Sequence, residues 1–134
     1  MTTLEIVCNA VIPTLGVLLL ARAYRVWRPA LLRVALVLAW SYAWHFTDRA
    51  LGIWPHFGLD YSAHTGVAIA IGAALAACGT RWLAVTVTML VFYAWCMNEV
   101  GYHPYADTLT TAAVNLPVAI AVQFVPRRRA VPAS

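Results

Sequence analysis

Five long apolar segments, separated by short polar connections, constrain this chain more than any other feature of its sequence. The segments cover residues 5–23, 29–46, 63–79, 82–98 and 106–125. Each approaches the roughly 20 residues that an α-helix needs to cross the hydrocarbon core of a bilayer. Backbone groups cannot stay unpaired in lipid, and the alternation typical of barrel strands is absent. The sequence therefore predicts an all-α, polytopic membrane helix bundle of about five transmembrane helices.

The composition agrees with a membrane location. Hydrophobic residues make up 63% of the 134 residues and charged residues only 10%, whereas a soluble domain of this length needs more polar surface. We expect a single transmembrane domain at residues 1–126, followed by a short basic tail at residues 127–134. The third segment is rich in Ala and Gly, which let helix backbones approach closely, so we expect it to lie at the centre of the bundle.

The arginines predict how the chain is oriented in the membrane. With five spans, eight of the nine basic residues fall on one side, namely Arg22, Arg25, Arg28, Arg33, Arg81, Arg127, Arg128 and Arg129. Cytoplasmic loops are enriched in Lys and Arg, so the N-terminus is predicted outside and the C-terminus, with its basic tail, in the cytoplasm. Because topology accounts for these charges, no nucleic-acid partner is expected. We expect an integral protein of a bacterial inner membrane.

Every histidine and every carboxylate lies on the opposite, extracytoplasmic side of this topology. The set comprises His45, His56, His64, His103, Glu5, Asp48, Asp60, Glu99 and Asp107, with Arg49 as the one cation beside them. Ionisable groups at membrane depth are costly and therefore mark functional sites by default. The active face is thus predicted to be extracytoplasmic, although His56, in a loop beside Pro55, is expected to have no role.

Three polar groups on this side follow one another along consecutive helical hairpins. They occupy residues 45–49, 60–65 and 99–107, and His103 precedes Asp107 by four positions. A His held by an Asp is a competent nucleophile, because the carboxylate fixes its tautomer and stabilises the cation that develops. A second His can donate a proton to a leaving group. The residue types therefore favour phosphoryl transfer.

Two of these runs resemble known motifs. Ser62-Ala63-His64-Thr65 resembles the Ser-Gly-His-Thr element of the type 2 phosphatidate phosphatase superfamily. The run VGYHPYAD at 100–107 resembles that family's later motif, a His followed four residues on by Asp, and residues 60–65 are also similar to the related sphingomyelin and inositol-phosphorylceramide synthases. The similarity covers roughly residues 45–125. In place of the family's Ser-Arg pair before the second His, this chain has Cys96-Met97.

The resemblance implies both an activity and a division of roles. His103 would be the nucleophile, Asp107 its orienting partner and His64 the general acid, with no metal or other cofactor. The protein would be a membrane-embedded lipid phosphatase or phosphotransferase, acting on a phosphorylated lipid at the outer leaflet. We expect the substrate to be held by Arg49, Ser62, Thr65 and His45.

Two functions of other classes stay open. His45, His64, Glu99, His103 and Asp107, together with Asp48, form a ligand inventory for Zn or Fe, and two histidines from separate helices can ligate haem. No local His-x-x-x-His motif supports this alternative. The chain could equally be a non-catalytic small subunit of a larger membrane assembly or a homo-oligomer.

The three cysteines, Cys8, Cys78 and Cys96, show no metal-type spacing. Cys8 and Cys96 are predicted near the same membrane face, so a disulfide between them is one interpretation. The preferred interpretation is that all three are small apolar residues buried between helices.

Overall fold

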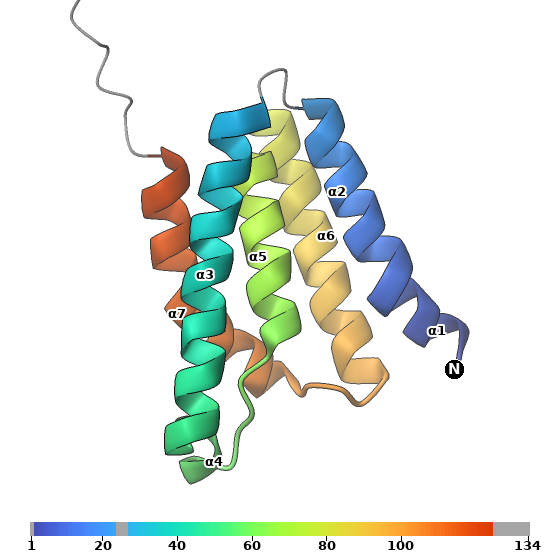
Figure 1. Ribbon diagram of the computed structural model, residues 1–134. Coiled ribbons are helices and arrows are strands. Elements are labelled where there is room, and N and C mark those ends of the chain that lie inside the picture. Colours follow the sequence, from blue (N-terminus) through green and yellow to red (C-terminus); the bar gives the residue numbers. More distant parts are fainter. Residues whose placement is uncertain (1, 24–26, 125–134) are drawn as a thin grey trace, which may run out of the picture.

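The computed structural model describes residues 2–23 and 27–124, and within these ranges it is a bundle of helices without strands (Figure 1). The long helices are α2 (Ile12–Ala23), α3 (Trp27–Leu51), α5 (Ala63–Ala76), α6 (Thr80–Glu99) and α7 (Tyr105–Phe124). The short elements are α1 (Thr3–Ile6), the π-helical η1 (Val7–Val11) and α4 (Ile53–His56). Each long helix falls on one of the predicted segments, which confirms the all-α fold class.

Three helical stretches are long and apolar enough to cross a membrane, namely Thr3–Arg22, Thr80–Glu99 and Tyr105–Phe124. Helix α5 is apolar but has only 14 residues. At 1.5 Å per residue this is about 21 Å, shorter than a hydrocarbon core of roughly 30 Å. Helix α3 has 25 residues, but its second half carries several polar side chains. These helices are compatible with an integral membrane protein, while five crossings and the orientation stay predictions.

Helix α7 buries its polar residues and exposes its apolar ones. The buried positions recur every fourth residue, at Asp107, Thr111, Asn115, Ala119 and Gln123. The exposed apolar side chains include Leu109, Leu116, Ile120 and Phe124. A helix surrounded by lipid has this arrangement, because its polar groups can find partners only inside the bundle. The burial pattern therefore supports a lipid environment independently of hydropathy.

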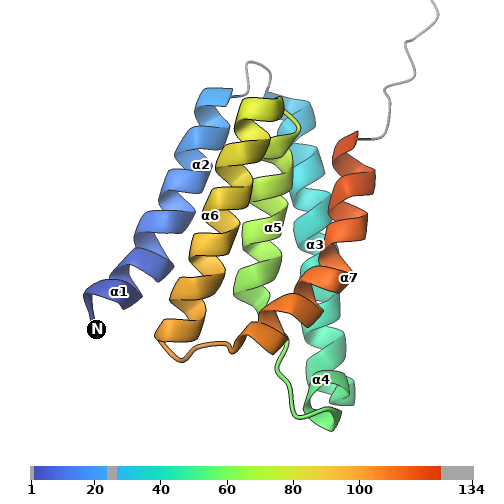
Figure 2. The same cartoon turned by 180° about the vertical axis from the view of Figure 1, so that it is seen from behind.

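Helix α5 lies at the centre of the bundle and packs against α2, α3, α6 and α7 (Figures 1 and 2). Two glycines permit the closest approaches. A Cβ atom at Gly66 would lie 1.8 Å from the Ser41 Oγ on α3, and one at Gly72 would lie 2.9 Å from the Thr86 Cγ2 on α6. The Thr86 hydroxyl donates to the Gly72 carbonyl at 3.1 Å. The predicted central position of the Ala- and Gly-rich segment is confirmed.

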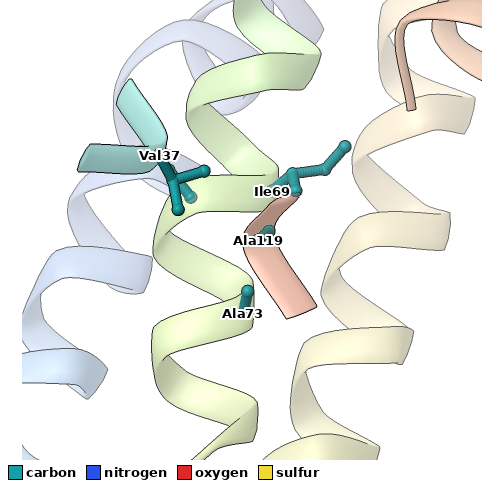
Figure 3. Close-up of a cluster of buried hydrophobic side chains, with 5 residues drawn as sticks. Val37, Ile69, Ala73 and Ala119 are labelled. Carbon is teal, nitrogen blue, oxygen red and sulfur yellow. The ribbon is translucent and has the colours of Figure 1, made fainter. Parts of the chain in front are cut away.

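Small aliphatic side chains fill the space where three helices meet. Figure 3 shows Val37 of α3, Ile69 and Ala73 of α5, and Ala119 of α7 converging in one cluster, which also contains Ala70. All of these side chains are buried. Because most of them are small, the backbones of α3, α5 and α7 can lie close to one another.

The N-terminal helical rod runs without interruption from α1 through η1 into α2, and its π-helical turn ends just before Pro13. Proline lacks the N–H that an α-helix needs at this point, and a π-turn is one way for a helix to absorb that loss. In the same turn, Cys8 packs against Cys96 and Tyr93 of α6. Cys8 and Cys96 are both fully buried and carry free thiols, so the preferred interpretation holds for them, whereas Cys78 is only partly buried.

The two ends of the bundle differ in chemistry. At the end where α3 and α6 terminate and α5 and α7 begin, here called the histidine end, lie residues 45–65 and 99–107 (Figure 1). At the opposite end lie Arg22, Arg33 and Arg81. The Arg33 guanidinium donates to the backbone carbonyl of Gln123 at 2.9 Å. Arg25, the tail at 127–134 with its three arginines, and the side chain of Arg28 lie outside the described residues. Apart from Arg49, which lies at the histidine end, the described arginines are thus separated from the histidines, in agreement with the predicted topology.

The contact at Gly66 yields a test of the packing. We expect Gly66→Ala to lower the free energy of unfolding by about 1–3 kcal/mol, the usual cost of overpacking a core, because the new methyl group overlaps Ser41. Gly16→Ala is the matched control and should lower the free energy of unfolding less, because a Cβ there would lie 3.3 Å from a side-chain methyl of Ile71. Thermal unfolding of both variants in detergent measures the difference. Equal losses in the two variants would contradict the assigned packing.

Candidate functional site

The connection between α3 and α5 is folded back by a buried carboxylate. Asp48, 4% exposed, accepts a hydrogen bond from the Trp54 backbone N–H at 2.7 Å. Gly52 between them has φ of +65°, a conformation that glycine adopts without strain. The Trp54 indole donates to Thr110 of α7 at 3.0 Å, and its ring packs edge-on against Tyr61 at 5.0 Å between centroids. These contacts bring the chain before α5 against the first turns of α7.

Two parallel hydrogen bonds then join this segment to α7. The backbone N–H of Asp60 donates to the Asp107 Oδ1 at 3.0 Å, and that of Ser62 donates to the Thr111 Oγ1 at 3.0 Å. Ser62 is also the N-cap of α5, where its Oγ accepts from the backbone N–H and the hydroxyl of Thr65. The start of α5 is thereby fixed relative to the start of α7.

The connection between α6 and α7 positions His103. Gly101 has φ of +72°, and the backbone N–H groups of Tyr102 and His103 both donate to the Met97 carbonyl, at 3.1 and 3.3 Å. The chain thus turns tightly around the last residues of α6. This turn directs the His103 side chain toward the residues that begin α5 and α7.

Two carboxylates face the same ring nitrogen of His103. Its Nδ1 lies 3.5 Å from the Asp107 Oδ2 and 3.8 Å from the Asp60 Oδ2. These separations are within ion-pair range, but neither forms a hydrogen bond, and Nδ1 is buried without a hydrogen-bonding partner among the described residues. The 11% of the His103 side chain that remains exposed therefore belongs to its other ring atoms. The side chain of Asp107 is 5% exposed and that of Asp60 is 70% exposed.

His64 lies beside His103 and is held by an aromatic neighbour. The centroids of the two imidazoles are 5.9 Å apart. The ring of Tyr102 stacks on the imidazole of His64, with 6.3 Å between the centroids and an interplanar angle of 18°. The Tyr102 hydroxyl accepts from the Asn9 amide at 3.1 Å. The N-terminal rod therefore supports the ring that orients His64.

A cavity of about 320 Å³ opens next to His64. Its wall consists mainly of residues from α5 and α6 and is completed by Ile12 and Pro13 of α2 and Tyr42 of α3. We refer to this space as the α5–α6 cavity. It combines an apolar interior with one imidazole, as ligand sites commonly do.

The structure brings together the three residues predicted to carry catalysis, His64, His103 and Asp107. The four residues predicted to hold substrate do not gather around these three side chains. Ser62 and Thr65 are buried, and their hydroxyls form the cap of α5. The ring of His45 lies 6.1 Å from that of Tyr61 between centroids. Arg49 is exposed at the end of α3, and no contact joins it to His64 or His103 among the described residues.

The alternative metal site finds no preformed geometry in the part of the chain that is described. No group of three His, Cys, Asp or Glu side chains there is close enough to hold a metal ion. Glu99 ends α6, whereas Asp107 lies in the first turn of α7, so the spacing of four from Glu99 through His103 to Asp107 does not place them on one helix. Asp48, another candidate ligand, is bonded to the Trp54 backbone.

Sequence reasoning assigned no individual role to three members of the site, namely Asp60, Tyr102 and Asn9. Asp60 opens the run 60–65, so its place beside the motif was a usable signal. Tyr102 precedes His103 directly, and an aromatic residue there carries no sign of its partner. Asn9 lies 93 positions from the tyrosine that it contacts, and one polar residue in an apolar segment does not reveal such a distant neighbour.

No protein-family model matches this sequence, and no curated protein or solved structure is similar enough to indicate a family or a fold.

The two carboxylates around His103 are expected to differ in their contribution to stability. Asp107→Ala removes the acceptor of the part-buried Asp60 N–H and should cost about 1.5–3 kcal/mol, the usual contribution of a hydrogen bond to a charged group. Asp60→Ala removes only an exposed carboxylate, and its backbone N–H still bonds to Asp107. Chemical or thermal unfolding in detergent distinguishes the two variants. Losses of equal size would show that the Asp60–Asp107 hydrogen bond does not hold the start of α5.

Proposed function

We propose that this protein transfers or hydrolyses the phosphoryl group of a membrane lipid at the extracytoplasmic face, with His103 as nucleophile. The observation that carries the proposal is the placement of Asp107 and Asp60 around one nitrogen of His103, with the imidazole of His64 5.9 Å away. A nucleophile, its orienting carboxylate and a proton donor are the groups that a covalent phosphoryl-transfer mechanism requires.

In the first step, the Nε2 of His103 attacks phosphorus and forms an N–P bond as the P–O bond to the lipid breaks. The nearby carboxylates stabilise the positive charge that develops on the ring. His64 gives its proton to the departing lipid oxygen. The separations at Nδ1 are longer than hydrogen bonds, and such contacts commonly shorten when substrate binds.

In the second step, an acceptor hydroxyl attacks the phosphohistidine, and the N–P bond breaks. His64, now neutral, takes the proton from this hydroxyl and is restored to its starting form. With water as acceptor the protein is a phosphatase, and with an alcohol group of a second lipid it is a phosphotransferase.

The start of α5 supports binding of the phosphate. No hydrogen bond is described for the backbone N–H groups of Ala63 and His64, and the N-terminus of a helix attracts anions. Arg49 lies in the last turn of α3, at the histidine end. We propose that its side chain contacts the phosphate once substrate is bound.

The proposal predicts that His103→Ala and His64→Ala each reduce phosphate release from lipid phosphates by about a hundredfold or more, the usual contribution of an acid–base or nucleophilic group. His56→Ala is the matched control, since His56 lies in the α4 turn, is exposed, and has no part in the mechanism. Size-exclusion chromatography and circular dichroism establish that each variant folds. Full activity in either of the first two variants would refute the proposed roles.

A second prediction separates this mechanism from metal or haem chemistry. Phosphate release should continue when the purified protein is assayed with excess chelator, because the proposed steps use side chains alone. The visible spectrum should also lack a haem band. A stoichiometric metal whose removal abolishes activity and whose return restores it would favour the metal alternative instead.

A further inference from the structure

We propose that the α5–α6 cavity holds the hydrocarbon chain of the phosphorylated substrate, with the phosphate end at His64 and the far end of the chain at Leu75. This inference rests on the proposed function, because it places the phosphate between the two histidines. The cavity adds a chain-binding site to the proposed catalytic residues, and its occupant is the hydrocarbon chain bonded to the reacting phosphate.

The wall of the cavity follows the helix axes. Residues of α5 line it at spacings of three and four, and the residues are Ala63, His64, Val67, Ala68, Ile71, Gly72 and Leu75. Helix α6 contributes a similar stripe, Thr86, Met89, Leu90 and Tyr93. Such spacings place side chains on one face of each helix, so the cavity is elongated along the bundle. From His64 to Leu75 it extends about 16 Å, roughly half the thickness of a hydrocarbon core.

The cavity has a floor at its inner end. Leu75 is only 1% exposed and packs against Leu20 of α2 and Ala74, with Trp82 and Val85 of α6 against the same cluster. On the histidine side, Ile12, Ala68 and Tyr93 of the lining also belong to the buried cluster around Cys8 and Cys96, whereas His64, in the same lining, is exposed and leaves the way in beside it. A chain that enters beside the histidines is therefore expected to extend inward until it meets Leu75.

The lining fits a hydrocarbon chain better than a polar ligand. The Thr86 hydroxyl is already bonded to the Gly72 carbonyl, and most of the other lining side chains away from His64 are apolar. Apolar cavities stay dry and accept apolar ligands. The volume of about 320 Å³ is at the lower end of the range for small-molecule sites, which suits a single chain rather than a bulky headgroup.

Continuity with the catalytic residues distinguishes this cavity from ordinary lipid-facing surface. His64 lines the cavity and also lies 5.9 Å from His103. A phosphate placed between the two rings would therefore direct its attached chain into the cavity. Binding also restores the van der Waals contacts that the cavity lining lacks when nothing fills it.

Two photoreactive dodecyl phosphates test this placement, one with a diazirine near the phosphate and one with a diazirine at the chain end. They are irradiated with the full-length protein in nanodiscs, and the labelled residues are mapped by mass spectrometry. We expect the first probe to label residues around Ala68 and Tyr93, and the second to label residues around Leu75 and Met89. Excess unlabelled dodecyl phosphate should reduce both signals at least tenfold. Equal labelling of lipid-facing residues such as Leu32 and Leu109, or the same pattern from both probes, would overturn the inference.

A cavity-filling variant gives a kinetic test. Ala68→Phe should reduce kcat/KM for dodecyl phosphate at least tenfold while changing that for butyl phosphate less than twofold, because a butyl chain does not reach far into the cavity. Ala113→Phe on the exposed face of α7 is the matched control and should leave both values unchanged. Equal losses on the two substrates in Ala68→Phe would count against a chain-binding role.

The labelling experiment also separates this inference from the proposed function. His103→Ala removes the nucleophile but not the cavity, so it should keep the depth-dependent labelling while losing phosphate release. Depth-dependent labelling without hydrolysis by the unaltered protein would refute the function and leave the cavity as a lipid site. Hydrolysis without depth-dependent labelling would refute the chain site and leave the function intact.

Discussion

The close contact between α5 and α3 is the interaction on which the rest of the structure depends. Gly66 has no side chain, so Ser41 can lie against the α5 backbone. The Ser41 side chain is hydrogen-bonded to the Tyr61 hydroxyl at 2.9 Å, and the same hydroxyl accepts from Asn115 of α7 at 2.9 Å. Tyr61 is thus fixed between three helices. Because it lies directly between Asp60 and Ser62, the two residues tied to α7, the packing of the helices determines the geometry around His103.

The same network shows how a bundle in lipid can carry polar groups without leaving most of them unpaired. Ser41 of α3 and Asn115 of α7 both bond to the Tyr61 hydroxyl. The bonds from Ser62 to Thr111 and from Asp60 to Asp107 continue this row of hydrogen bonds toward the histidine end. Each group is costly in hydrocarbon if unpaired. These hydrogen bonds thereby stabilise a single register of the three helices, and they also fix the positions of Asp60 and Asp107 beside His103.

Much of this arrangement could be predicted from the sequence, because apolar length and small-residue content report directly on a lipid environment. The helices, the central place of α5 and the convergence of His64, His103 and Asp107 all follow from such local signals. Asp60, Tyr102 and Asn9 could not be assigned in the same way. Their roles depend on contacts between distant segments, and the exposed carboxylate of Asp60 acquires its meaning only once the loop is folded back by Asp48 and Trp54. The burial of Ser62 and Thr65 also depends on tertiary contacts, since their part in capping α5 leaves little of either hydroxyl for a ligand.

The buried stripe on α7 has a consequence for membrane insertion. Asp107, Thr111, Asn115 and Gln123 lie on one side of this helix, and each would meet lipid if α7 entered the bilayer alone. The hydrogen-bonding partners of Asp107, Thr111 and Asn115 belong to a segment that is synthesised earlier, at Asp60, Ser62 and Tyr61 in the stretch leading into α5. When α7 leaves the ribosome, a complementary polar surface is thus already available. If α7 crosses a membrane, as its length and apolar composition allow, this order of elements along the chain would let it integrate against its neighbours rather than as an independent span.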